Sequence, residues 1–496
     1  MSEHIRKAAR DSIIIFVLML ITGLMGYFIR ITLAKNLTVG EYGLFFSIFT
    51  LFSFLSLFVD LGLSQGTINK LVEYRVHKKF KEMKNLSLSI LYVQLTLAVF
   101  FSIGLLLLQS FLSNNYYRTD VSHIMLPFCI YFVTLPLAFF LVNIIYGFGR
   151  SVLRGALDTI KNVFILSILI VVFYSFNATI KAPAYAYALA NILVLAIYTP
   201  IFLKLFPNFF KLKFNFVPAD VWKTFKYGMY VTLATMGWMI ITQTDTLMLT
   251  YFSTLENVGI YQVALPISTT LLLVATAIGT AIYPIFSEFQ ARKDFEKMSE
   301  MTSAIYSYIE IIILPAAIIL FVYPEIIINV LFGSKFSAGS AVIQIFALSG
   351  PFISLGLINY YVLSAIGKAK KSLKIMLLAA LVNLVLNFVL IPFYGIIGAA
   401  IASVIAFLII MIVSTMQLYK IYKFTLPYWK LAKILFCSLM FLLSIHLLKR
   451  ALELNVWAEM AAVISISGAI YLLLLYMTNT VNKENIKNIL KNVRII

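Results

Sequence analysis

Long runs of apolar residues, separated by short polar turns, alternate along almost the whole chain. As a helix, a run of about 20 residues is long enough to cross roughly 30 Å of hydrocarbon. The pattern predicts fourteen membrane-spanning helices, at residues 12–34, 43–69, 86–111, 122–147, 156–176, 182–203, 227–251, 258–286, 302–323, 340–364, 373–393, 395–417, 431–448 and 457–477. The turns at 177–182 and 393–394 are so short that a re-entrant segment remains an alternative at each.

Composition excludes a water-soluble globule. Of the 496 residues, 62% are hydrophobic and 12% are charged, whereas a soluble domain is nearer half apolar and a quarter charged. We therefore expect an all-α integral membrane protein. The run 12–34 is longer than a signal-peptide core and no small-residue cleavage site follows it, so we expect a retained first span. Cys129 and Cys437 lie far apart in apolar runs and are expected to be packing residues.

Charge is distributed unevenly between alternate turns. Of the 39 Lys and Arg residues, 32 fall in turns on one side of the predicted membrane. By the positive-inside rule this predicts that both termini are cytoplasmic, in a cell membrane. Basic loops facing an anionic leaflet explain the net charge of +19 without nucleic acid. Residues 204–226 interleave Lys with Phe and Trp, and 482–496 carry apolar and basic residues at helical spacing, so both are expected to lie on the membrane surface.

The two halves of the chain repeat each other at an offset of about 216 residues. The order around Gly43-Leu44-Phe45 returns at Gly259, and Asn143 has its counterpart in Asn359. We expect an N-terminal six-helix bundle at 1–203, an interfacial linker at 204–226, a second six-helix bundle at 227–420, and two extra helices with a basic tail at 421–496. Parallel repeats of this kind enclose a central cavity.

Five motifs occur in order along this frame. They are VGEYGLFF followed by VDLGLS, then TDTLMLTYFSTLENVGIYQVA, then VLFGSKFSAGSAVIQIFALS, and then NLVLNFVLIPFYGIIGAAIAS. The sequence resembles the polysaccharide-biosynthesis flippases of the multidrug/oligosaccharidyl-lipid/polysaccharide exporter superfamily. The resemblance covers nearly the whole chain.

The resemblance implies alternating-access movement of a polyprenyl-diphosphate-linked oligosaccharide from the cytoplasmic to the outer leaflet. It implies contacts with membrane lipids and glycan-assembly proteins, no bound cofactor, and coupling to H⁺ or Na⁺. The alternatives are a cation-coupled drug or metabolite antiporter of the same superfamily and, from the enzymes, a membrane-embedded polysaccharide polymerase or ligase. An enzyme is not expected, because the longest predicted external loop has only about 16 residues. Relatives carry arginines for the diphosphate, but here no span interior apart from that with Arg30 is expected to hold Lys or Arg.

Charged residues inside the predicted spans are the first site candidates, because hydrocarbon solvates charge poorly. Arg30 and Asp245 occupy matching positions near the outer ends of spans one and seven. They either pair across the outer mouth, or Arg30 binds a diphosphate while Asp245 binds a cation; alternatively, Arg30 only reaches toward the interface. Asp60 either holds a turn or binds a ligand. Glu310 precedes Pro315 by five residues and is a candidate for a proton or sodium site, or for a structural pair.

Amide side chains inside the spans are the second set, because amides both donate to and accept from sugar hydroxyls. The candidates are Gln94, Asn143, Gln243 and Asn359. Asn383 and Asn387 lie four apart on one helical face and are expected to link helices. The four histidines are too scattered for a metal site.

Overall fold

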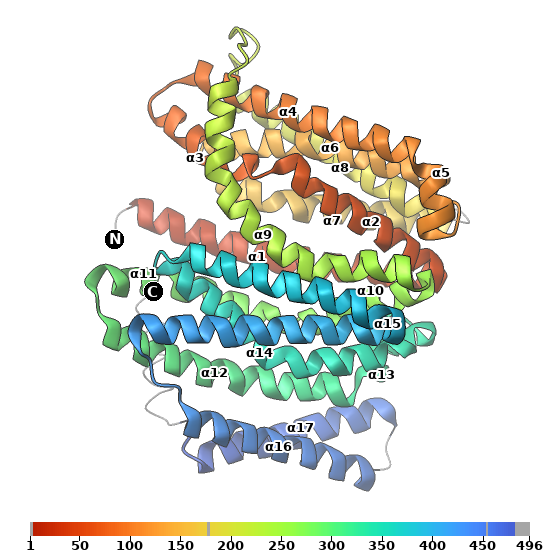
Figure 1. Ribbon diagram of the computed structural model, residues 1–496, viewed down its shortest axis with the longest axis vertical. Coiled ribbons are helices and arrows are strands. Elements are labelled where there is room, and N and C mark those ends of the chain that lie inside the picture. Colours follow the sequence, from red (N-terminus) through yellow and green to blue (C-terminus); the bar gives the residue numbers. More distant parts are fainter. Residues whose placement is uncertain (1–2, 176–178, 453–454, 482–496) are drawn as a thin grey trace. The chain divides into compact units, whose positions relative to one another are not determined.

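A computed structural model describes residues 3–175, 179–452 and 455–481 (Figure 1). All regular secondary structure in this part of the chain is helical, as the sequence predicted. The surface helix predicted at 482–496 lies outside the described residues. Two compact units form, the first from Met1–Val263, Ile328–Ala338 and Leu384–Ala399, and the second from Ala264–Ile327, Gly339–Asn383 and Ala400–Ile496. The predicted division at 203, 226 and 420 stays a prediction.

The helices account for all fourteen predicted spans. In chain order they are α1 (Glu3–Asn36), α2 (Val39–Asp60), α3 (Leu63–Val76), α4 (Phe80–Leu107), α5 (Gln109–Phe111), the π-helix η1 (Leu112–Tyr117), α6 (Ser122–Gly147), α7 (Ser151–Ser175), α8 (Lys181–Leu205), α9 (Pro218–Phe252), α10 (Leu255–Thr269), α11 (Leu272–Arg292), α12 (Phe295–Val322), α13 (Pro324–Leu331), the 3₁₀ helix η2 (Ser334–Gly339), α14 (Ser340–Ala365), α15 (Ala369–Tyr422), α16 (Tyr428–Ala451) and α17 (Val456–Met477). Among the described residues, twelve segments are long and apolar enough to cross a membrane. One of them, α15, has 54 residues and covers two predicted spans, and α9 covers the seventh.

Three predicted boundaries were wrong in detail. The span at 43–69 is two helices, because Leu61 and Gly62 adopt left-handed backbone conformations that end α2 at Asp60. The span at 258–286 is divided between α10 and α11. At 393–394 no separate turn forms; α15 instead kinks at Gly395, whose φ is 53° and ψ is −128°.

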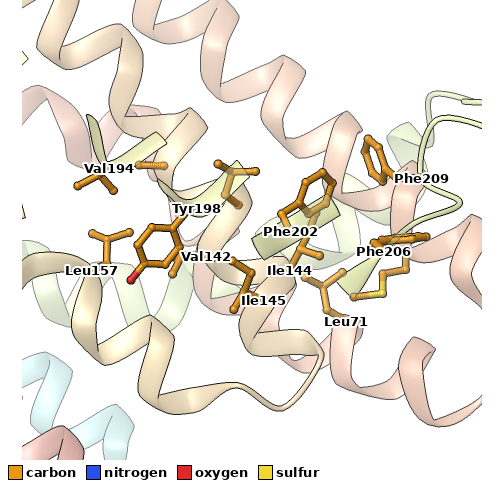
Figure 2. Close-up of a cluster of buried hydrophobic side chains, with 13 residues drawn as sticks. Leu71, Val142, Ile144, Ile145, Leu157, Val194, Tyr198, Phe202, Phe206 and Phe209 are labelled. Carbon is orange, nitrogen blue, oxygen red and sulfur yellow. The ribbon is translucent and has the colours of Figure 1, made fainter. Parts of the chain in front are cut away.

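Aromatic and aliphatic side chains from several helices form the core of the first unit (Figure 2). The cluster is built on α3, α4, α6, α7, α8 and the segment after α8; its members include Leu71, Ile144, Leu157, Tyr198 and Phe202. Phe209, beyond the end of α8, joins it with its ring 4.9 Å from that of Phe202. Lys84 donates to the carbonyl oxygens of Phe209 (2.6 Å) and Leu212 (2.7 Å). The start of the linker is thus fixed to the helical bundle, whereas Phe214, Phe216 and Trp222 are exposed, as an interfacial segment requires.

In the second unit, α12 packs against α11, α14 and α16. The two last helices, α16 and α17, lie side by side (blue in Figure 1). Phe441 and Ile445 of α16 and Tyr471 of α17 share a buried cluster with residues of α12. The extra helix pair is therefore an integral part of this unit.

Site-directed labelling tests the topology. In a background in which the buried Cys129 and Cys437 are replaced by Ala, single cysteines are placed at positions that are exposed in the structure. Cysteines at Asn114, Thr254 and Ser334 should react with an impermeant maleimide on intact cells, and those at Lys78, Lys293 and Lys368 only after permeabilisation. Reaction of two of the second set on intact cells would contradict the fourteen-span topology.

Candidate functional site

The N-terminal helical turns of α2 and α10, whose sequences repeat each other, lie against each other in the first unit. A β-carbon on Gly43 would overlap the carbonyl oxygen of Leu255, and one on Gly259 would overlap that of Val39. Each glycine therefore contacts the residue four positions before the other glycine. The contact is symmetric between the two repeats. Small residues let membrane helices approach this closely.

Arg30 lies beside this contact and binds equivalent positions of the two repeats. Arg30 Nη1 donates to the backbone carbonyl oxygen of Gln262 at 2.8 Å. The side-chain Oε1 of Gln262 lies 3.5 Å from the same nitrogen. The guanidinium lies 4.2 Å from the centre of the Phe46 ring, and cation–π contact of this kind stabilises a partly buried arginine. Phe46 and Gln262 follow Gly43 and Gly259 by the same three residues. Arg30 thus holds the two turns together with a charge-assisted bond.

Asp245 is fully buried near the same place. Its carboxylate accepts hydrogen bonds from the Tyr261 hydroxyl and from Asn387 Nδ2, both at 2.5 Å. Its neighbour Thr246 accepts from Gln262 Nε2 at 2.6 Å. Gln262 thus connects Arg30 to Thr246, the residue next to Asp245. The functional coupling of Arg30 and Asp245 stays a prediction. The predicted candidate Gln243 lies two residues before Asp245 on α9 and is half-buried.

A cavity of about 190 Å³ lies among the helices of the first unit. It is lined by Phe52, Ser53, Ser56, Val59, Asp60, Gln94, Tyr131, Phe132, Leu135, Pro136, Phe139 and Lys161. The predicted candidates Asp60 and Gln94 meet here, where Asp60 Oδ1 accepts from Gln94 Nε2 at 2.9 Å and from the Ser64 backbone at 3.1 Å. The end of α2 at Asp60 aims this carboxylate across to α4. Aromatic faces beside amide, hydroxyl and ionic groups suit a polar ligand that also has an apolar face.

The expectation that only Arg30 lies inside a span was wrong. Because α7 begins at Ser151, Arg154 and Lys161 belong to a membrane-spanning helix. Lys161 lines the cavity and pairs with Asp158 at 2.8 Å. Arg154 donates to Oδ1 of the predicted candidate Asn143 at 3.1 Å. The spacing of these charges at 154, 158 and 161 is helical and no proline interrupts it, so they fit a single helix.

The remaining candidates lie in the second unit. Asn359 is fully buried: its Oδ1 accepts from the Tyr306 hydroxyl at 2.6 Å, and its Nδ2 donates to Ser414 at 2.8 Å and Thr415 at 3.0 Å. Both amide hydrogens are used, so this side chain joins α12, α14 and α15. Glu310 is also buried and lies near Ser354. The structure therefore separates the candidates into cavity-lining residues and residues that link helices.

Replacing a contact glycine tests the packing of the two turns. Gly43→Ala adds a methyl group where the Leu255 carbonyl lies, so the free energy of unfolding should fall by about 1–3 kcal/mol. The measurement is a thermal or denaturant unfolding curve of the purified protein. Gly23→Ala, in α1, is the matched control, because its β-carbon would meet no atom within 4 Å. Equal stability of the two variants would contradict the close contact.

Comparisons with known proteins agree with this fold. The family model described as "Polysaccharide biosynthesis protein" matches residues 8–290, and the MatE model matches residues 229–389. The chain is 27% identical to an uncharacterized membrane protein of Methanocaldococcus jannaschii, with 95% of each chain covered. It is 25% identical to the probable low-salt glycan biosynthesis flippase Agl15 of Haloferax volcanii over 37% of this chain and 39% of the relative. To a putative O-antigen transporter of Shigella flexneri it is 24% identical, over 75% of this chain and 88% of the relative.

Solved structures share the fold at low sequence identity. The lipid II flippase MurJ in an inward closed conformation has a TM-score of 0.76 at 17% identity, covering 94% of this chain and 98% of its own. An inward-facing multidrug resistance MATE family transporter has a TM-score of 0.65 at 14% identity, covering 81% and 96%. With its family-model match extending over more than half of its length, the chain belongs to the polysaccharide biosynthesis protein family.

Proposed function

We propose that this multi-pass membrane protein is a flippase for a polyprenyl-diphosphate-linked oligosaccharide. It moves the glycan from the cytoplasmic to the outer leaflet by alternating access, during biosynthesis of a surface polysaccharide or glycan. Membership of the polysaccharide biosynthesis protein family is the observation that carries the proposal. Two relatives named as a glycan biosynthesis flippase and an O-antigen transporter support the same substrate class.

The cavity in the first unit supports recognition of the sugar part of this substrate. Its volume of about 190 Å³ is several times the roughly 10–15 Å³ that a cavity needs to hold one water molecule, so a polar group of the substrate can enter it. Phe52, Phe132 and Tyr131 offer ring faces, and Gln94 offers an amide. The carboxylates of Asp60 and Asp158 offset the charge of Lys161, so a neutral sugar suits the cavity better than a diphosphate.

Arg30 is the side chain that we assign to the diphosphate or to closure of the outer end. A guanidinium has five N–H donors, and the contacts with Gln262 use only part of them. Phosphate groups are favoured partners of arginine because two parallel hydrogen bonds form. Asp245 and Glu310 are the candidates for a coupling H⁺ or Na⁺.

The cellular setting follows from the same proposal. The protein lies in the cell membrane with both termini in the cytoplasm, contacts membrane lipids and works beside glycan-assembly proteins, and it makes and breaks no covalent bond. A cation-coupled antiporter is the second candidate, favoured by the MatE match over residues 229–389.

Depletion of the protein tests the function. Lipid-linked oligosaccharide should accumulate and stay inaccessible to an external glycosidase in intact cells, becoming accessible only after permeabilisation, because the glycan remains on the cytoplasmic face. A control culture re-expressing the protein should restore external access. Accumulation of complete but unpolymerised units on the outer face would favour an enzyme. Unchanged glycan distribution together with raised sensitivity to cationic dyes would favour the antiporter.

Substitution of Arg30 tests its role in transport. Arg30→Ala should lower the rate of glycan appearance outside by about tenfold or more, since charge-assisted hydrogen bonds contribute about 1.5–3 kcal/mol. Arg30→Lys should keep partial activity. Gln262→Ala is the matched control, because the 2.8 Å bond is made to its backbone carbonyl, and its effect should be smaller. Normal transport by Arg30→Ala would remove Arg30 from the mechanism.

A further inference from the structure

Glu310 lies inside a membrane-spanning helix, with an incomplete set of hydrogen bonds. The residue is in the middle of α12 and only 3% exposed. Its Oε2 is buried and has no hydrogen-bond partner among the described residues. Its Oε1 is 3.4 Å from the hydroxyl oxygen of Ser354 on α14. A charged carboxylate in such surroundings has a large desolvation cost.

The hydroxyl of Ser354 has only one hydrogen to donate. That hydroxyl is 2.9 Å from the carbonyl oxygen of Pro351, closer than it is to Glu310. If Ser354 donates to Pro351, its oxygen can only accept from Glu310. The contact between Glu310 and Ser354 is then a hydrogen bond only when the carboxyl carries a proton.

No cation offsets a charge at this position among the described residues. α14 contains no Lys, Arg, Asp or Glu. Several titratable groups on the packed helices contact other residues. Glu288 and Arg292 of α11 pair with each other at 2.5 Å, and Lys430 and Lys449 of α16 lie over Tyr308 and Tyr323. Lys433 donates to the Thr478 carbonyl, and Cys437 lies 3.8 Å from the Thr478 hydroxyl. Three tyrosines are also engaged: Tyr471 of α17 donates to the Ile311 carbonyl, Tyr306 donates to Asn359, and Tyr422 of α15 is 2.8 Å from Thr302.

We propose that Glu310 is a proton-binding site and that it holds its proton in this conformation, donating it to Ser354. A metal cation would need several oxygen ligands, and here only the Glu310 carboxyl and the Ser354 hydroxyl face each other. The proposal that Glu310 binds a proton rests on the geometry alone. The proposal that this proton is coupled to transport rests in addition on the proposed function.

Loss of the proton would leave a charged carboxylate buried between α12 and α14. A carboxylate at Glu310 must gain water or a counter-ion. It gains neither while α14 covers it, so deprotonation favours a conformation in which α12 and α14 separate at Ser354. Pro315, between one and two turns further along α12, has no N–H to donate within the helix, which gives this movement a place to occur.

Labelling with dicyclohexylcarbodiimide tests the site without any substrate. This apolar reagent adds to a protonated carboxyl group: a C–O bond forms, the proton moves to nitrogen, and rearrangement leaves a stable N-acylurea. With the full-length protein in phospholipid nanodiscs, mass spectrometry should find the adduct on Glu310. Its yield should fall about tenfold per pH unit above the titration midpoint, as for a single carboxyl group. A water-soluble carbodiimide should not modify Glu310, because the side chain is buried.

Two variants and one salt serve as controls. Glu310→Gln should abolish the adduct and leave the unfolding temperature unchanged, because glutamine resembles the neutral acid. Glu325→Gln, at an exposed position of α13, should leave the Glu310 adduct intact. Absence of the adduct from folded protein at any pH would overturn the proton site. Protection by NaCl but not by choline chloride at constant pH would overturn it in favour of sodium. A labelled Glu310 in a protein that moves no glycan would refute the transport proposal alone.

Discussion

A contact between the backbones of two equivalent turns is the constraint on which the first unit depends. Lipid tails are as apolar as leucine side chains, so helices in a membrane gain little from burying apolar surface and associate through close packing and hydrogen bonds. Gly43 and Gly259 provide that closeness, because neither has a β-carbon. Their approach places Gln262 within reach of Arg30 while Phe46 lies under the same guanidinium. One charged side chain is thereby held by both copies of a duplicated turn.

Three ionisable groups inside the helical units are held by local partners. Asp245 is held by Tyr261 and Asn387, Asp60 by Gln94 and Ser64, and Lys161 by Asp158. Partnering reduces the cost of a charge in hydrocarbon, but it also uses the groups that a ligand would bind. Glu310 differs from these residues because its Oε2 lacks a partner among the described residues. The partnered groups therefore link helices, whereas Glu310 is able to exchange a proton.

The sequence predicted the spans and the repeat because both depend on hydropathy and on residue order. The predicted span 43–69 runs through Asp60, because Leu61-Gly62-Leu63 continues an apolar run. A turn at Asp60 was one of two alternatives for that residue, and the backbone conformation shows that α2 ends there. The predicted span 156–176 begins after Arg154, because that charge lowers the hydropathy of the run, whereas α7 extends back to Ser151. The meeting of Asp60 with Gln94 was beyond prediction, since the two lie on separate helices and no local pattern encodes their distance. Asn359 was judged by residue type, and only the structure shows that its amide is fully used by neighbours.

The two extra helices at the C-terminus satisfy a backbone group that a proline leaves unpaired. Pro315 has no N–H, so the carbonyl oxygen of Ile311, four residues earlier, lacks its usual partner in α12. In hydrocarbon an unsatisfied carbonyl costs several kcal/mol. The hydroxyl of Tyr471 on α17 donates to this oxygen at 3.0 Å, and a cluster containing Phe441 surrounds the contact. Because Ile311 directly follows Glu310, the helix pair supports α12 at the residue next to the buried carboxyl. Any movement of α12 at Glu310 must therefore either carry α17 with it or break the bond to Tyr471.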